Sequence, residues 1–223
     1  MRRSSILVGS AIGLIVALVG LALSSRLELI AVAIARPEGQ WLWYISRAAG
    51  VTAYVGLVLA TIWGLLLSTS LADAIVSRGR SLEAHRWLSA TALALSVAHA
   101  VPLIGDRYVS FDPLDVVVPF LAPYRPIAVG LGIVGLYLAM AVYGSFWLRA
   151  HLGQRGWRAV HFLSFPAFGL VTLHGLYAGT DSGAPWLRAI YLTAILAVGA
   201  LTVVRVLGHA GPAVRRASAR AQG

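Results

Sequence analysis

The sequence contains no cysteine and no lysine, and only eight of its 223 residues are acidic. Without cysteine the chain cannot form disulfides, thiolate metal sites, iron–sulfur clusters or the C-x-x-C-H attachment of a c-type haem. Methionine is almost as scarce, with Met1 and Met140 alone. The chain therefore has too few methionines for a methionine-rich copper path and few candidates for a His/Met axial pair. Any metal or haem must therefore be held by the six histidines.

The composition is that of a membrane protein. Hydrophobic residues make up 59% of the chain, charged residues only 12%, and the mean hydropathy is +0.80. This share of charge is about half of what a soluble domain carries. The net charge of +10 does not indicate a nucleic-acid partner, because the arginines lie at the ends of apolar runs and not on one polar face. The expected surroundings are membrane lipid.

Six apolar runs are each long enough to cross a bilayer, which takes roughly 20 residues for about 30 Å of hydrocarbon. They cover residues 6–24, 48–69, 84–104, 126–148, 159–178 and 186–207. The expected fold class is therefore all-α, a six-transmembrane-helix bundle. The first run could instead be a cleaved signal peptide, but its length favours a retained helix.

The distribution of arginine predicts the orientation, because short cytoplasmic loops retain positive charge. Twelve of the 18 arginines fall on one side of the six runs, and six of the eight acidic residues fall on the other side. We expect the arginine-rich side, with both termini, to be cytoplasmic in a bacterial-type plasma (inner) membrane.

Four histidines lie in or beside two of the apolar runs: His85 and His99 on the third, and His161 and His174 on the fifth. Ionisable residues in a membrane are rare and costly, so each suggests a function, although an interhelical hydrogen bond is the simpler alternative for any one of them. The two spacings of 14 and 13 residues correspond to about 21 and 20 Å of helix. Because the third and fifth runs cross in the same direction, His85 is level with His161 and His99 with His174.

Two stacked histidine pairs match the need of two b-type haems, each of which takes an axial imidazole on both faces of its iron. We therefore expect haem sites between helices 3 and 5, with the four histidines as iron ligands. The spacing fits one helix better than the other, because 14 residues return a helix to within about 40° of its starting face, whereas 13 leave it about 140° away. Pro166 offers a cause for local distortion of the fifth helix.

Arginines near each level are candidates to pair with the anionic haem propionates through charge-assisted hydrogen bonds. The candidates are Arg86 and Arg158 at the inner level and Arg47, Arg107 and Arg125 at the outer level, with ordinary interface arginines as the alternative. His151 and His209 lie in cytoplasmic connections, where we expect them to be solvated.

These motifs resemble the ferric reductase-like transmembrane domain family, which includes eukaryotic ferric reductases, the membrane core of NADPH oxidases and the bacterial MsrQ-like haem b subunit. The resemblance covers about Trp43 to Arg205. It is carried by six short motifs: Ser46-Arg47-Ala48-Ala49-Gly50, Ala84-His85-Arg86, Ala98-His99-Ala100, Tyr124-Arg125-Pro126, Trp157-Arg158-Ala159-Val160-His161, and Leu173-His174-Gly175.

The resemblance implies transmembrane electron transfer through two b haems, held by His85 with His161 and by His99 with His174. It divides the chain into residues 1–42, a first helix with its outer connection, 43–207, the haem-binding domain, and 208–223, a short basic cytoplasmic tail. Residues after Leu207 contain no G-x-G-x-x-G unit, so FAD and NADPH, or a quinol, would act only through a partner. Leu103 stands where the oxygen-reducing oxidases have a further histidine, which puts superoxide production in doubt.

The expected function is a haem b subunit of a ferric reductase-like oxidoreductase. It would carry electrons from a separate flavoprotein or quinol to an external acceptor, either a ferric chelate or a periplasmic reductase partner. One alternative is a proton-coupled transporter with relay histidines, which is disfavoured because the apolar runs contain no acidic residue suited to a relay. The other is a non-redox membrane assembly protein with structural histidines.

Overall fold

The computed structural model describes residues 41–69, 71, 73, 76–104, 106 and 111–221, with side chains described as far as residue 208. Every regular element in this part of the chain is a helix, as the sequence predicted. The helices are α3 (Trp41–Thr69), α4 (Arg78–Ile104), α5 (Pro126–Gly144), α6 (Arg149–Phe162), α7 (Ser164–Ala178) and α8 (Pro185–Ala221). The predicted first span, 6–24, lies outside the described residues.

Five segments of this structure are long and apolar enough to cross a membrane, with α6 and α7 together forming one of them. They correspond to the second to sixth predicted spans. Side chains such as Trp87, Ile127 and Leu196 are more than 60% exposed on the outer faces of these helices. Because such large apolar side chains are stable in hydrocarbon and not in water, the chain is a multi-pass membrane protein.

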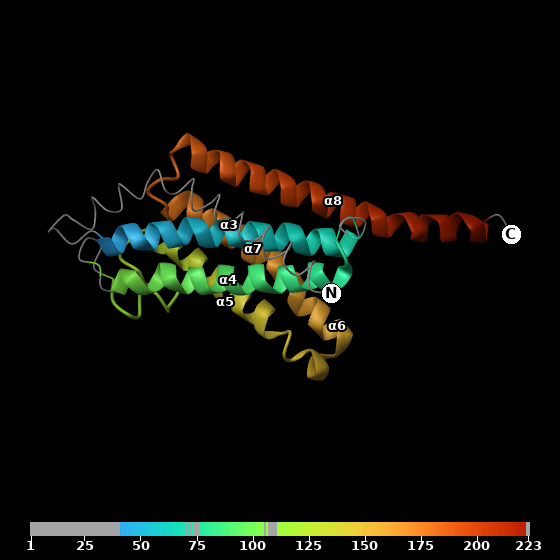
Figure 1. Ribbon diagram of the computed structural model, residues 1–223, viewed down its shortest axis with the longest axis horizontal. Coiled ribbons are helices and arrows are strands. Elements are labelled where there is room, and N and C mark those ends of the chain that lie inside the picture. Colours follow the sequence, from blue (N-terminus) through green and yellow to red (C-terminus); the bar gives the residue numbers. More distant parts are fainter. Residues whose placement is uncertain are drawn as a thin grey trace.

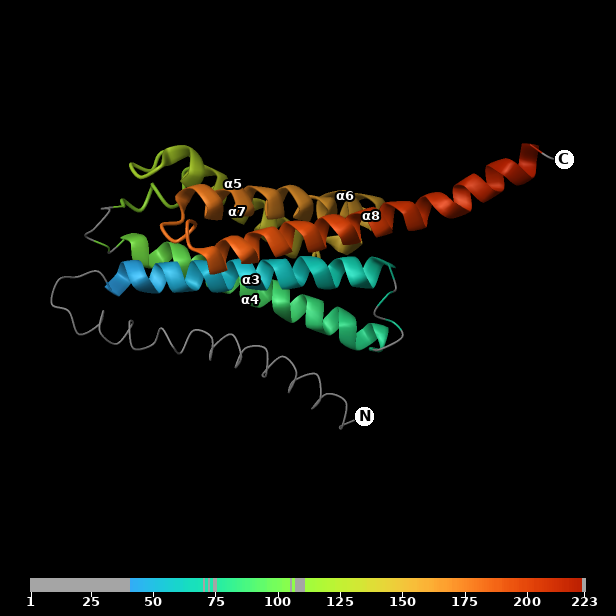
Figure 2. The ribbon, with the colours of Figure 1, turned by 90° about the horizontal axis from the view of Figure 1, so that it is seen from above.

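With α6 and α7 counted as one span, successive spans run in opposite directions through the bundle (Figure 1). α3 packs mainly on α4, α5 packs mainly on α7, and α8 lies along α3. α4 and α7 run in the same direction but do not pack closely on each other. Figure 2 shows α5 and α7 on one side of the bundle and α3 with α4 on the other. The bundle therefore consists of two helix pairs that leave space between α4 and α7.

Local sequence explains where several helices begin and end. The hydroxyls of Ser68 and Thr69 donate to the carbonyl of Leu65 and satisfy it near the end of α3. α5 begins with Pro126, which suits a first helical position because its missing N–H would have no partner there. The residue before it, Arg125, has a left-handed backbone with φ of 42°. α8 continues to Ala221, so the predicted basic tail extends the last helix.

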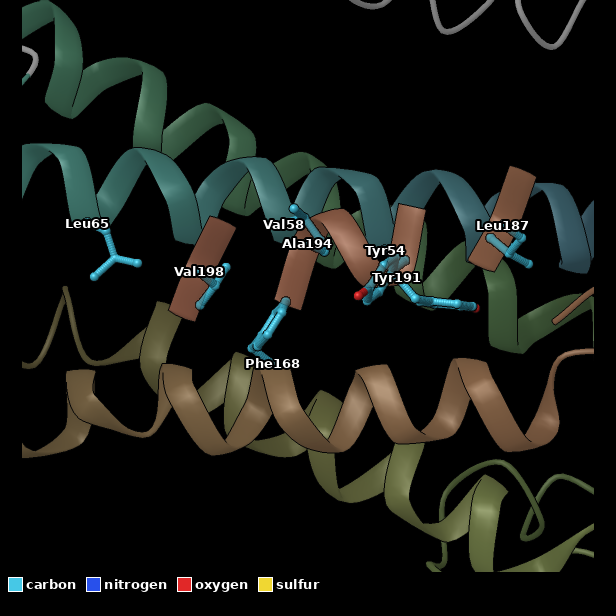
Figure 3. Packing of buried hydrophobic residues seen from close by; sticks show 8 residues of the cluster. All are labelled: Tyr54, Val58, Leu65, Phe168, Leu187, Tyr191, Ala194 and Val198. Carbon is cyan, nitrogen blue, oxygen red and sulfur yellow. The ribbon is translucent and has the colours of Figure 1, made fainter. Parts of the chain in front are cut away.

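The apolar core lies between α3, α7 and α8. Its buried side chains are Tyr54, Val58, Leu65, Phe168, Leu187, Tyr191, Ala194 and Val198 (Figure 3). The α3–α4 interface is instead built from small residues, with Gly56 against Ala92. Small residues allow close approach of helix backbones in a membrane, where packing takes the place of the hydrophobic effect. The core thus fixes α7 against α3 and α8, while α4 is held close to α3.

Candidate functional site

A cavity of about 760 Å³ runs through the centre of the bundle. It is lined by residues of all six helices described, including His85, His99, His161 and His174. All four histidines are half-buried. The cavity is therefore the space that α4 and α7 leave between them, and the four histidines border it.

The four histidines form the two pairs that the sequence predicted. The ring centres of His85 and His161 lie 6.2 Å apart with an angle of 66° between the ring planes. Those of His99 and His174 lie 6.0 Å apart with an angle of 72°. Each pair joins α4 to the α6–α7 segment across the cavity, and the two pairs have nearly the same geometry.

A helix break explains how both histidines of the fifth span face the cavity. α6 ends at Phe162 and α7 begins at Ser164. Between them Leu163 donates its backbone N–H to Val160, three residues back. Pro166 lies in the first turn of α7 and has no N–H to donate to the end of α6. The break interrupts the regular rotation of 100° per residue, so a 13-residue spacing can place two side chains on one face.

Three of the four histidines are held by the backbone of a neighbouring helix. Nδ1 of His85 donates to the carbonyl of Ala60 at 3.0 Å. Nδ1 of His99 donates to the carbonyl of Ser46 at 2.7 Å, and Nδ1 of His174 donates to that of Ala128 at 2.9 Å. Because a carbonyl can only accept, the proton is on Nδ1 in each case. Nε2 therefore keeps its lone pair, the arrangement that orients a metal-ligating imidazole.

Ser46 adds a second hydrogen bond at the outer pair. Its hydroxyl donates to the backbone carbonyl of His99 at 2.7 Å and lies 3.1 Å from Nδ1 of the same residue. Ser46 is only 1% exposed. The start of α3 and the end of α4 are thus joined through both the backbone and the side chain of His99, which fixes this ring in place.

Glycines on the neighbouring helices lie directly behind the same three rings. A Cβ atom at Gly132 would lie 2.5 Å from Nδ1 of His174, and one at Gly50 would lie 2.7 Å from Nδ1 of His99. At Gly64 the nearest atom would be Cε1 of His85, at 3.1 Å. Only glycine lets the rings come this close to the helix backbone.

These glycine positions were not predicted as part of the site. The signal was present on α3, because Gly50 and Gly64 are 14 residues apart, as are His99 and His85 on the antiparallel α4. Gly175 lies against the hydroxyl of Tyr191, and a Cβ at Gly169 would meet nothing within 4 Å.

The ring separations fit a metal ion between the members of each pair. Two imidazole–metal bonds of about 2 Å, with each ring centre roughly 1 Å behind its nitrogen, place the ring centres about 6 Å apart. Among the described residues neither pair has a hydrogen bond between its two rings. The described part also contains no group of three or more His, Cys, Asp or Glu side chains suited to a bare metal ion. The two imidazoles of a pair therefore suit a metal that brings its remaining donors with it, as haem iron does.

Arginines dominate the end of the cavity that His85 and His161 border. Five line it, and they are Arg78, Arg86, Arg149, Arg158 and Arg205. Of these, Arg86 and Arg158 were predicted as partners for an anionic group. The guanidinium of Arg86 lies over the ring of Phe146, 4.7 Å from its centre. Asp181, at the opposite end, is the only acidic residue among those that line the cavity.

The outer arginines are already engaged. Arg47 lines the cavity but forms an ion pair with Asp181 and lies over the ring of Tyr44. Arg125 donates to the carbonyl of Tyr177 and is absent from the cavity lining. Arg107 lies outside the described residues. Of the two predicted outer arginines that the structure describes, Arg47 lines the cavity and Arg125 does not.

Two tyrosines border the cavity close to Thr172 and Gly175 of α7. The hydroxyls of Tyr54 and Thr172 lie 3.2 Å apart, and the ring of Tyr54 contacts that of Tyr191 with centres 4.9 Å apart. Both tyrosines line the cavity and project between the helices (Figure 3). His151 is exposed on α6 and does not line the cavity, while the side chain of His209 lies outside those described.

Comparisons of the chain with family models, curated proteins and solved structures find no match. The resemblance to the ferric reductase-like family therefore stays a prediction, and the geometry of the histidine pairs has to support any proposal by itself.

Proposed function

We propose that this chain is a membrane electron-transfer subunit that holds two b-type haems between α4 and the α6–α7 segment. The observation that carries the proposal is the repetition of one arrangement at two levels. In each pair the rings are about 6 Å apart and border one cavity, and three of the four rings present an Nε2 lone pair. Structural histidines would need neither the repeated spacing nor the space between the rings.

Each proposed haem site would be formed by one histidine pair. His85 and His161 would hold the inner haem, with Arg86 and Arg158 available to its propionates. His99 and His174 would hold the outer haem, with Arg47 at the adjacent end of the cavity. When bound, b-type haem supplies a one-electron couple. The chain itself would hold the two couples at separate depths in a low-dielectric interior.

The arginine-rich end of the cavity supports the proposed orientation, in which this end and both termini face the cytoplasm of a bacterial-type cell. A sixth span at 6–24 completes the proposed bundle. The donor would be a separate flavoprotein or a quinol at the inner end. The acceptor would be a ferric chelate or a periplasmic reductase partner at the outer end.

Proteoliposomes test the proposed function. Ferricyanide is trapped inside the vesicles, and dithionite, which does not cross the bilayer, is added outside. We expect the wild-type chain to carry electrons to the trapped ferricyanide, and His85→Ala and His99→Ala each to abolish this, because electrons must pass both levels. His151→Ala is the matched control, since this exposed histidine lies outside the cavity. Equal rates in empty vesicles and in vesicles with the wild-type chain would reject electron transfer.

A further inference from the structure

The four histidines are not held equally. The rings of His85, His99 and His174 each donate an Nδ1 hydrogen bond to a backbone carbonyl and each have a glycine directly behind them. His161 has no side-chain hydrogen bond to any residue that the structure describes. Its ring instead lies against Trp157, with the ring centres 5.1 Å apart and an angle of 27° between the planes. Among the described residues its orientation therefore depends on ring contacts with Trp157 and His85 and on no hydrogen bond.

The helix that carries His161 is also the least firmly packed part of the site. α6 has no buried residue along its whole length, and its helical geometry is interrupted at Gly153, where φ is 63°. It ends one residue after His161, at the break before α7. In Figure 1 this segment diverges from the other helices at the inner end of the bundle. By contrast, His174 lies within the continuous helix α7, next to the buried Thr172.

The ring of His161 borders the cavity. Among the described residues it has neither a glycine directly behind it nor a hydrogen bond that holds it, so it is freer to move than the other three rings. The ring of His174 has no such freedom, because Gly132 lies behind it and Ala128 accepts its Nδ1 proton. A rotation about the side-chain bonds of His161 would break the contact with Trp157 and no hydrogen bond.

Resting on the proposed two-haem function, we infer that His161 is an exchangeable ligand, so that the inner site also binds a small uncharged π-acceptor molecule such as carbon monoxide. A hydrogen bond on the second ring nitrogen strengthens a metal–imidazole bond, and losing such a partner typically lowers metal affinity about 10- to 100-fold. The exchange swaps one neutral donor, the Nε2 lone pair of His161, for another, and transfers no electron or proton. The outer site, anchored on both sides, excludes the same molecule.

Carbon monoxide difference spectra of the dithionite-reduced, haem-loaded chain test this inference. We expect carbon monoxide to bind one of the two haems. His99→Ala/His174→Ala, which removes the outer site, should leave a haem that binds carbon monoxide. His85→Ala/His161→Ala, which removes the inner site, should leave one that does not.

A single substitution tests the same point without deleting a ligand. Trp157→Leu removes the stacking contact and should raise the rate of carbon monoxide binding about two- to tenfold. This factor corresponds to the free energy that one aromatic contact typically contributes. Trp87→Leu, on the exposed face of α4 and outside the cavity lining, should leave the rate unchanged.

The outcomes separate this inference from the proposal on which it rests. The inference that His161 is exchangeable fails if the chain binds two haems and carbon monoxide binds neither of them, both equally, or the outer one alone. Each of these results would leave the two-haem proposal standing. An unchanged binding rate in Trp157→Leu would also overturn it. A purified chain without haem would overturn both.

Discussion

Replacing Gly132 with alanine should displace His174 and weaken haem binding at the proposed outer site. The new Cβ would lie 2.5 Å from Nδ1, 2.7 Å from Cγ and 2.9 Å from Cε1 of His174, whereas ordinary contacts begin at 3.4 Å. The ring would have to retreat by about 1 Å, on the scale of the misplacement that disables precisely built sites. It cannot retreat that far and keep its 2.9 Å hydrogen bond to Ala128.

The expected loss follows from that hydrogen bond. Removing the partner of a metal-ligating histidine lowers metal affinity about 10- to 100-fold, which corresponds to about 1.4 to 2.7 kcal/mol. Alanine also favours the helix over glycine by about 1 kcal/mol, which offsets part of the fold stability lost with the hydrogen bond. The same substitution at Gly199 supplies the control, because a Cβ there would meet nothing within 4 Å.

The assay is haem titration of the purified chain followed by absorbance, with thermal unfolding recorded on the same samples. Gly132→Ala should bind the outer haem more weakly, and Gly50→Ala should show a similar loss. Gly64→Ala should weaken binding of the inner haem by a smaller factor, because its overlap with His85 is smaller. Gly199→Ala should bind both haems as the wild type does. Unchanged haem affinity in Gly132→Ala would refute the reasoning, because it would mean that His174 is not held where the structure places it.

Three further predictions concern the helix break and the outer end of the site. Pro166→Ala restores a backbone N–H donor at the helix break, so the helix should become regular and turn His161 away from the cavity. Haem analysis should then find about one haem per chain, and two haems would contradict this. Ser46→Ala should keep both haems but lower the free energy of unfolding by about 0.5–1.5 kcal/mol, since the carbonyl of His99 loses a buried donor, and an unchanged unfolding midpoint would contradict it. Arg47 and Asp181, whose side chains are 30% and 38% exposed, should show a coupling of about 0.2–1 kcal/mol in a double-mutant cycle of Arg47→Gln and Asp181→Asn. A coupling well above that range would contradict this prediction.

The helical fold was predictable because hydropathy acts over whole segments. About 20 apolar residues in a row leave few alternatives to a membrane span, and five described segments match the predicted ones. The ends were less accurate, with α3 beginning at Trp41 and not at residue 48. Residues near helix ends lie where water can satisfy the backbone, so their hydropathy does not define where the helix stops.

The pairing of the histidines was predictable from depth alone, because residue number along a straight helix gives position across the bilayer. The anchoring of the rings was not, since it depends on contacts between helices that are distant in sequence. The carbonyls of Ser46, Ala60 and Ala128 carry no signal in the sequence, because every residue has a carbonyl. The 14-residue spacing of Gly50 and Gly64 was visible but has meaning only beside the antiparallel α4.

The uneven support of His161 likewise became visible only in three dimensions. The sequence suggested a distortion at Pro166, and the structure locates the break at Leu163 and shows α6 without buried residues. Trp157 belongs to a motif noted in the sequence, but its stacking on His161 depends on one turn of α6 placing both rings on the same face.

The central claim is that two histidine pairs hold two haems. Its most direct test is haem quantification with a reduced-minus-oxidised spectrum, on detergent-purified wild type, His99→Ala, His174→Ala and the control His151→Ala, all expressed with adequate haem supply. The account predicts about two b-type haems per chain in the wild type and the control, and about one in each of the other variants. Wild-type protein that is folded but contains no haem would contradict it.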